Sequence, residues 1–142
     1  RIAAATREVG AEDSVRLLGR CDDATLAAVL AAADVQVFPV RDLPGDVEGF
    51  GMVAIEAAAA GVPTIGFAVG GVPEAIASGK SGAVVPAGDY RALAQTLVDW
   101  TARRRTDPEA TAQACRQHAA SYAWPRFGER LRDIVSRRTE GP

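Results

Sequence analysis

The chain has 142 residues, a formal net charge of −2 and 48% hydrophobic residues. A domain of this length buries roughly 68–70% of the surface of its unfolded chain, so a single domain with a sizeable core is expected. The charge gives no electrostatic reason to expect a nucleic-acid partner, and no apolar run is long enough to span a bilayer. Two cysteines are too few for a disulfide framework, and nothing resembles a signal peptide, which favours a reducing cytoplasm.

Apolar runs and helical patterns alternate along the chain. In order they predict a helix at residues 1–9, a buried strand at 14–18, a helix at 24–33 capped by Asp22 or Asp23, a strand at 35–39, a helix from near Gly51 to Gly61, a strand at 63–67, a helix with Pro73 and Glu74 in its first turn, a strand at 83–86, and helices at 90–103, 108–122 and 125–137. This alternation predicts an α/β fold with a parallel sheet and right-handed crossovers. Ligands of such sheets gather beyond the carboxyl ends of the strands.

Residues 48–63 carry the most informative pattern, with Glu48 and Glu56 on either side of a glycine-flanked helix start. Gly49 and Gly51 allow the backbone to approach a ligand closely, and the first amides of a helix lack intrahelical partners. These amides can bind an anion such as a phosphate, with help from the helix dipole. Glu56 can accept hydrogen bonds from neutral hydroxyls. Together these groups suit a sugar nucleotide.

Six segments resemble the carboxyl-terminal, donor-binding domain of a retaining glycosyltransferase of the GT-B architecture, in family 4 (group 1). They are residues 15–20, 26–38, 48–63, 70–74, 82–89 and 122–127. The resemblance implies a Rossmann-like parallel sheet with helices on both faces, incomplete at its N-terminus, with closing helices at about 108–137 and an absent N-terminal acceptor domain. Residues 46–51 look most like bacterial mannosyltransferases that use GDP-mannose.

The resemblance also implies a role for individual residues. Glu48 would be catalytic and would contact sugar hydroxyls, and Glu56 would hold the ribose diol. The amides of Phe50, Gly51 and Met52 would meet the diphosphate. The implied donor-binding residues are Glu48, Gly49, Phe50, Gly51, Met52 and Glu56, together with Arg20, Cys21 and Asp22 in a turn that lines the base pocket. Gly70 and Gly71 would border the same cleft. No metal and no cofactor are expected, because the GDP- or UDP-linked sugar is itself a substrate.

One departure from the family pattern concerns cations. The family's phosphate-binding Arg and Lys belong to a segment upstream of residue 1, and two carboxylates beside a diphosphate need compensating charge. Arg20 or Arg41 is a candidate for this role. The isolated chain is therefore expected to bind donor weakly and to be inactive by itself.

The implied partners are a nucleotide sugar and, through the absent domain, a lipid or glycan acceptor, with peripheral contact to the inner face of the plasma membrane. Two other functions stay open, a non-catalytic scaffold and a sugar-nucleotide epimerase. A glycosidase is disfavoured, because eight helical residues would separate the two carboxylates by ~12 Å, against ~5–9.5 Å in hydrolases. His118 is expected to be a solvated surface residue, and residues 70–71 to form a structural turn.

Overall fold

A computed structural model describes residues 2–41 and 49–139, and side chains as far as residue 137. Three strands, β1 (Gln36–Phe38), β2 (Thr64–Phe67) and β3 (Gly82–Val85), form a parallel sheet in the order β1-β2-β3. Val37 aligns with Ile65 and Gly66 aligns with Val84. The carboxyl ends of all three strands therefore meet at one edge of the sheet.

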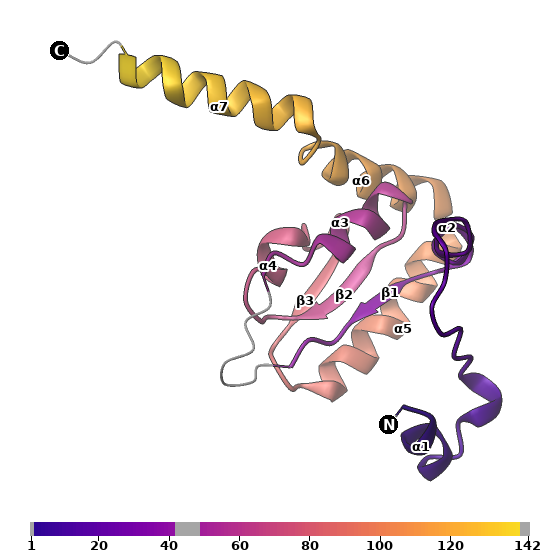
Figure 1. Ribbon diagram of the computed structural model, residues 1–142. Helices are drawn as coiled ribbons and strands as arrows, with labels where there is room; N and C mark the ends of the chain where they lie inside the picture. Colours follow the sequence, from indigo (N-terminus) through magenta and orange to yellow (C-terminus); the bar gives the residue numbers. More distant parts are fainter. Residues whose placement is uncertain (1, 42–48, 140–142) are drawn as a thin grey trace.

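Helices cover both faces of this sheet (Figure 1). They are α1 (Ile2–Glu8), α2 (Asp23–Ala32), α3 (Met52–Ala59), α4 (Val72–Ala75), α5 (Tyr90–Thr106), α6 (Pro108–Ala120) and α7 (Trp124–Thr139), with a 3-10 turn η1 (Glu12–Ser14). α5 lies on one face, α3 and α4 lie on the other, and α6 packs along α3. α7 projects away from the body of the molecule. The predicted α/β class with helices on both faces is confirmed.

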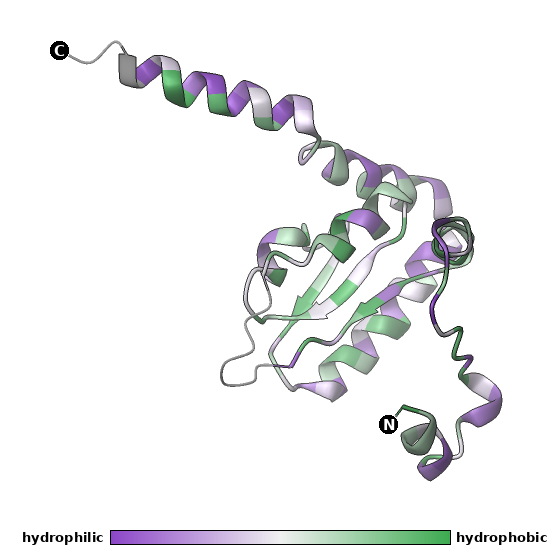
Figure 2. Cartoon of the chain, viewed as in Figure 1, coloured by the Kyte–Doolittle hydropathy of each residue, from purple (hydrophilic) through white to green (hydrophobic). Residues whose placement is uncertain are grey.

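The core has two parts because alternate strand residues point to opposite faces. Ile65, Phe67 and Val85 pack with Leu93 and Trp100 of α5. The opposite face holds a second cluster, made of Ala54, Ile55, Val72, Ala75 and Ile76, with Phe38 and Val84 packed against it. Figure 2 shows apolar residues on the strands and on α3, whereas α7 alternates between apolar and polar residues.

The predicted strand at residues 14–18 is wrong. Ser14 ends the η1 turn, residues 15–18 adopt no regular structure, and Val15, Leu17 and Leu18 are 40%, 54% and 46% exposed. A strand requires a hydrogen-bonded neighbour. Among the described residues β1 pairs with β2 alone, and none pairs with residues 15–18. This run therefore has the composition of a strand but no sheet to join.

The other predicted elements are confirmed, with ends shifted by a few residues. Asp22 caps α2, since its carboxylate accepts a hydrogen bond from Thr25 N at 2.8 Å. The apolar face predicted for this helix is nevertheless uncovered, with Leu26 and Val29 exposed. No described helix is both long enough and apolar enough to cross a bilayer.

Candidate functional site

The start of α3 is set by Gly51, the residue before its first turn. Gly51 has left-handed backbone angles, φ 75° and ψ 43°, which an L side chain rarely adopts. It is also buried, and a Cβ built on it would lie 3.3 Å from Phe38 Cε1. Ala54 N donates to Gly51 O at 2.9 Å, so the helix begins as predicted. We call residues 49–51 the glycine turn.

The amide groups of Met52 and Val53 belong to the first turn of α3, where N–H groups have no intrahelical acceptor. Both side chains are exposed, by 57% and 39% respectively, so water or a ligand can reach this end of the helix. The partial positive charge of a helix N-terminus favours an anion there by ~0.3–1 kcal/mol. The helix start is therefore present where the sequence predicted it, and anion binding there stays a prediction.

Glu56 lies on the solvent face of α3, one turn after Met52. The residues around it, Ala54, Ile55, Ala57 and Ala58, are buried, which leaves its side chain directed away from the core. A carboxylate on this face can meet hydroxyl groups of a ligand held at the start of the helix. This position is compatible with the predicted contact to a ribose diol.

Glu48, the predicted catalytic residue, lies outside the described residues. The argument against a glycosidase loses part of its basis as well, because the helix begins only at Met52. Four helical steps from Met52 to Glu56 rise ~6 Å, about half of the separation that eight would give. Helix geometry alone therefore does not fix the distance between the carboxylates of Glu48 and Glu56.

Gly71 packs directly against the glycine turn. Its amide donates to Gly49 O at 3.0 Å, and a Cβ on Gly71 would lie 2.3 Å from Gly49 O and 2.9 Å from Phe50 Cα. Only a residue without a side chain fits at this distance. The expectation that Gly70 and Gly71 border the same region thus agrees with the structure, and the segment is a structural turn that supports it.

His118, in α6, and Tyr122, two residues after the end of α6, contact Phe50 and α4. The rings of Phe50 and Tyr122 lie 5.4 Å apart, and those of His118 and Tyr122 lie 5.2 Å apart. His118 Nε2 lies 2.9 Å from Ala75 O, and Tyr122 Oη donates to Glu74 O at 2.8 Å. The prediction of His118 as a solvated residue without a partner is wrong. Its i, i+4 spacing to Tyr122 was the sequence signal that could have found the pair.

The residues predicted to line the base pocket precede α2. Arg20, Cys21 and Asp22 are exposed in the segment that leads into this helix. The hydrogen bond from Thr25 lowers the pKa of the Asp22 carboxyl, so this carboxylate acts as a helix cap. Arg41 is exposed. The roles of Arg20, Cys21 and Asp22 at a base pocket stay predictions.

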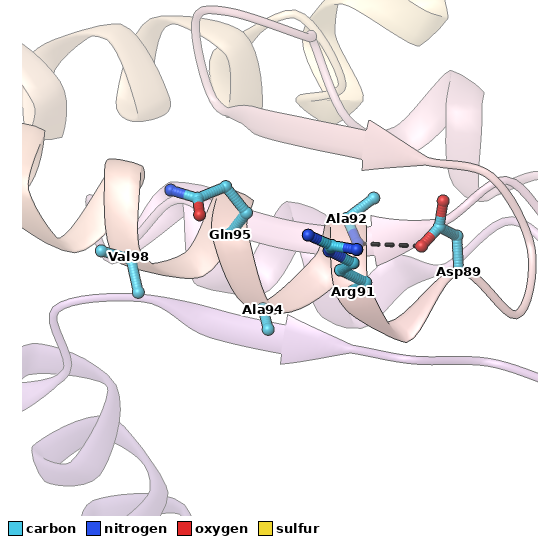
Figure 3. A pocket seen from close by; sticks show the side chains of 6 residues that line it. All are labelled: Asp89, Arg91, Ala92, Ala94, Gln95 and Val98. Carbon is cyan, nitrogen blue, oxygen red and sulfur yellow. Dashed lines mark hydrogen bonds between the residues drawn. The ribbon is translucent and has the colours of Figure 1, made fainter.

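A hollow of about 620 Å³ lies along the outer face of α5 (Figure 3). Its lining residues are Asp89, Arg91, Ala92, Ala94, Gln95 and Val98. The dashed line in the figure is the bond from Ala92 N to Asp89 Oδ1, 2.9 Å long, which caps α5. The residues that line this hollow do not include the glycine turn. We favour the glycine turn, because a ligand site needs polar groups that converge.

Among the described residues, no group of three His, Cys, Asp or Glu side chains is placed to hold a metal ion.

Comparison with known proteins identifies the family. Residues 1–103 match the family described as "Glycosyl transferases group 1". The chain belongs to this family. Group 1 members with curated descriptions include the D-inositol 3-phosphate glycosyltransferase of Mycolicibacterium smegmatis, which is 36% identical over 130 residues, or 92% of this chain and 28% of that protein. A GDP-mannose-dependent phosphatidylinositol monomannoside mannosyltransferase of Corynebacterium glutamicum is 38% identical over 128 residues, or 86% of this chain and 32% of that protein.

Solved glycosyltransferase structures share the fold. Sucrose-phosphate synthase from Thermosynechococcus elongatus superposes with a TM-score of 0.72 and 30% identity, over 96% of this chain and 34% of that one. HepE of Anabaena, solved in complex with UDP, superposes with a TM-score of 0.65 and 25% identity, over 95% of this chain and 35% of that one. The chain thus spans about three tenths of the two curated relatives and about a third of these structures.

Proposed function

We propose that this chain is the donor-binding part of a retaining glycosyltransferase. The donor is a nucleotide-diphosphate hexose, of mannosyl or glucosyl type and linked to GDP or UDP. The acceptor is a lipid or glycan, bound by another part of the enzyme. The proposal is supported by membership in the group 1 family and by relatives described as acting on inositol phosphate and with GDP-mannose.

The observation that carries the proposal is the arrangement at the start of α3. Gly51 begins the helix in a left-handed conformation, Met52 and Val53 in the first turn are exposed residues, and Glu56 follows one turn after Met52 on the same solvent face. A diphosphate at the amides would place its ribose within reach of the Glu56 carboxylate. Hydrogen bonds that involve a charged group contribute ~1.5–3 kcal/mol each.

The proposed reaction transfers the hexosyl unit with retention. An acceptor hydroxyl attacks the anomeric carbon from the face that the nucleotide diphosphate leaves. The bond between the anomeric carbon and the phosphate oxygen breaks, and the departing diphosphate takes the hydroxyl proton. The contribution of this chain is to hold the diphosphate and to stabilise the negative charge that develops on it. Glu48 would contact the sugar hydroxyls. No metal or other cofactor enters this scheme.

We further propose a cytoplasmic enzyme that works at the inner face of the plasma membrane. This placement follows from a lipid-linked acceptor and from the low cysteine content. It depends on the acceptor and is independent of the donor test below.

The test is saturation-transfer NMR on this chain with UDP, GDP and ADP in equal amounts, repeated on Glu56→Gln. Ribose saturation of one nucleotide that is lost in Glu56→Gln is the expected result. Glu8→Gln is the matched control, since Glu8 is an exposed carboxylate in α1. Equal ribose saturation in Glu56→Gln and in Glu8→Gln would refute the role of Glu56. Absence of binding by any nucleotide would oppose a donor site formed by this chain.

A further inference from the structure

Tyr122 and His118 connect α6 with the glycine turn. We propose that both are positioning residues, which hold the backbone of residues 49–51 in the conformation needed at the start of α3. Neither residue would touch the donor; each acts through Phe50 or α4. The link to donor binding rests on the function proposed above, whereas the effect on the turn does not.

The first contact is direct. The ring of Tyr122 lies 5.4 Å from the ring of Phe50 at an interplanar angle of 53°. Phe50 is half-buried and packs against the core cluster around α3 and α4, to which Ala119 of α6 also contributes. Paired aromatic rings stabilise each other beyond the area they bury. Tyr122 therefore restrains the central residue of the turn.

The second contact runs through α4. This helix has only four residues, so its carbonyl groups lack intrahelical donors. Tyr122 Oη donates to Glu74 O, and His118 Nε2 lies at hydrogen-bond distance from Ala75 O. Since a carbonyl oxygen only accepts, Nε2 must carry the proton. The side chains of His118, in α6, and of Tyr122, just after it, thus act as partners for the last two carbonyl groups of α4.

At its other end α4 holds the turn itself. Gly71, the residue before α4, donates its amide to Gly49 O at 3.0 Å. A shift of α4 would therefore move Gly49, and a shift of Tyr122 would move Phe50. The contact through α4 ends at Gly49 and the ring contact of Tyr122 ends at Phe50, which are the two residues directly before Gly51. Binding sites need their groups held to within about 0.5 Å, so this support bears on affinity for a ligand at the α3 amides.

The test separates ring contact from hydrogen bonding. Tyr122→Phe keeps the ring and removes the bond to Glu74 O, His118→Phe keeps a ring and removes the bond to Ala75 O, and Tyr122→Leu removes the ring. Phe127→Leu is the control, because Phe127 is an exposed aromatic residue in α7 whose ring partner is Trp124. The readout is hydrogen exchange of the Gly71 amide by NMR, with the Ile65 amide in β2 as the reference for global stability.

We expect the Gly71 amide to exchange about threefold to tenfold faster in Tyr122→Leu, and less so in the two phenylalanine variants, with Ile65 unchanged. Phe127→Leu should match the parent chain. Unchanged exchange at Gly71 in Tyr122→Leu, or an equal increase at Ile65, would overturn the positioning role.

The ligand arm uses GDP and UDP, titrated into the parent chain and into Tyr122→Leu. A fall in affinity of about threefold or more for the nucleotide that binds supports the link to the donor site. Equal affinity in both would overturn that link. If neither nucleotide binds the parent chain, the proposed function fails while faster exchange at Gly71 still supports the positioning of the turn.

Discussion

The amide of Gly71 lies 3.0 Å from the carbonyl oxygen of Gly49, and the two glycines are in contact without any side chain between them. This bond joins the turn before α4 to the turn before α3. It explains why a second glycine pair follows the Glu48–Gly51 pattern in the sequence. Gly71 therefore supports the shape of the first turn and need not meet a ligand itself.

Gly71→Ala should therefore displace the glycine turn. The new Cβ would lie 2.3 Å from Gly49 O, so either the turn or α4 must move. Such overpacking costs ~1–3 kcal/mol of unfolding free energy, which urea denaturation would measure. Gly49→Ala is the steric control, since among the described residues a Cβ there meets no atom within 4 Å. An equal loss of stability in both variants would contradict the role of close contact at Gly71.

The two cysteines should differ in reactivity. Cys21 is exposed, whereas Cys115 is fully buried in α6 and burial raises the pKa of its thiol to about 11. Because the thiolate is the reactive form, a maleimide reagent at neutral pH should label Cys21 in the folded chain and Cys115 only after unfolding. Mass spectrometry of the digested product identifies the site. Equally fast labelling of both thiols would show that α6 opens readily.

Burial of Cys115 also predicts a loss of stability at high pH. The folded state keeps this thiol neutral up to about pH 11, whereas an unfolded thiol ionises near 9.0. The unfolded state therefore releases its proton first, and stability declines as the pH rises from 9 to 11. The measurement compares urea denaturation of the parent chain and of Cys115→Ala across this interval. Their difference in stability should change with pH; a constant difference would contradict the raised pKa.

The cap of α2 predicts a pH dependence of opposite sign. The pKa of the Asp22 carboxyl is lowered by its hydrogen bonds with Thr25, so the cap is intact above the ordinary value of 3.8 and is lost as the pH falls through the lower folded value. The Thr25 amide shift in NMR should report this titration below pH 3.8. Asp22→Asn keeps a capping oxygen but cannot titrate, so the transition should disappear. A transition that persists would assign it to another group.

Sequence reasoning found the elements whose neighbours lie close in the chain. The start of α3 next to Gly51 and the cap of α2 at Asp22 are local features, and each agreed with its prediction. The strand at residues 14–18 was wrong because pairing depends on a partner strand, which composition does not reveal. A local pattern indicates residues that favour a strand, but these residues form a strand only where a neighbouring strand is available for hydrogen bonding.

The candidate site divides in the same way. Glycine spacing located the start of α3, and the structure adds that Glu56 lies on the exposed face of this helix. The support from His118 and Tyr122 could not be predicted in full, because Phe50 and Tyr122 are 72 positions apart in the sequence and meet only after α6 packs along α3. Contacts between distant segments depend on tertiary packing, which the pattern of a single sequence does not reveal.

The position of β1 has a practical consequence for handling this chain. One side of β1 bonds to β2, and on its other side the described residues provide no strand, so backbone N–H and C=O groups are presented in a row beside the exposed Val37. Such an edge is a template for pairing with a second molecule. At the concentrations needed for NMR, reversible self-association through this edge would broaden the spectra, and dilution should sharpen them.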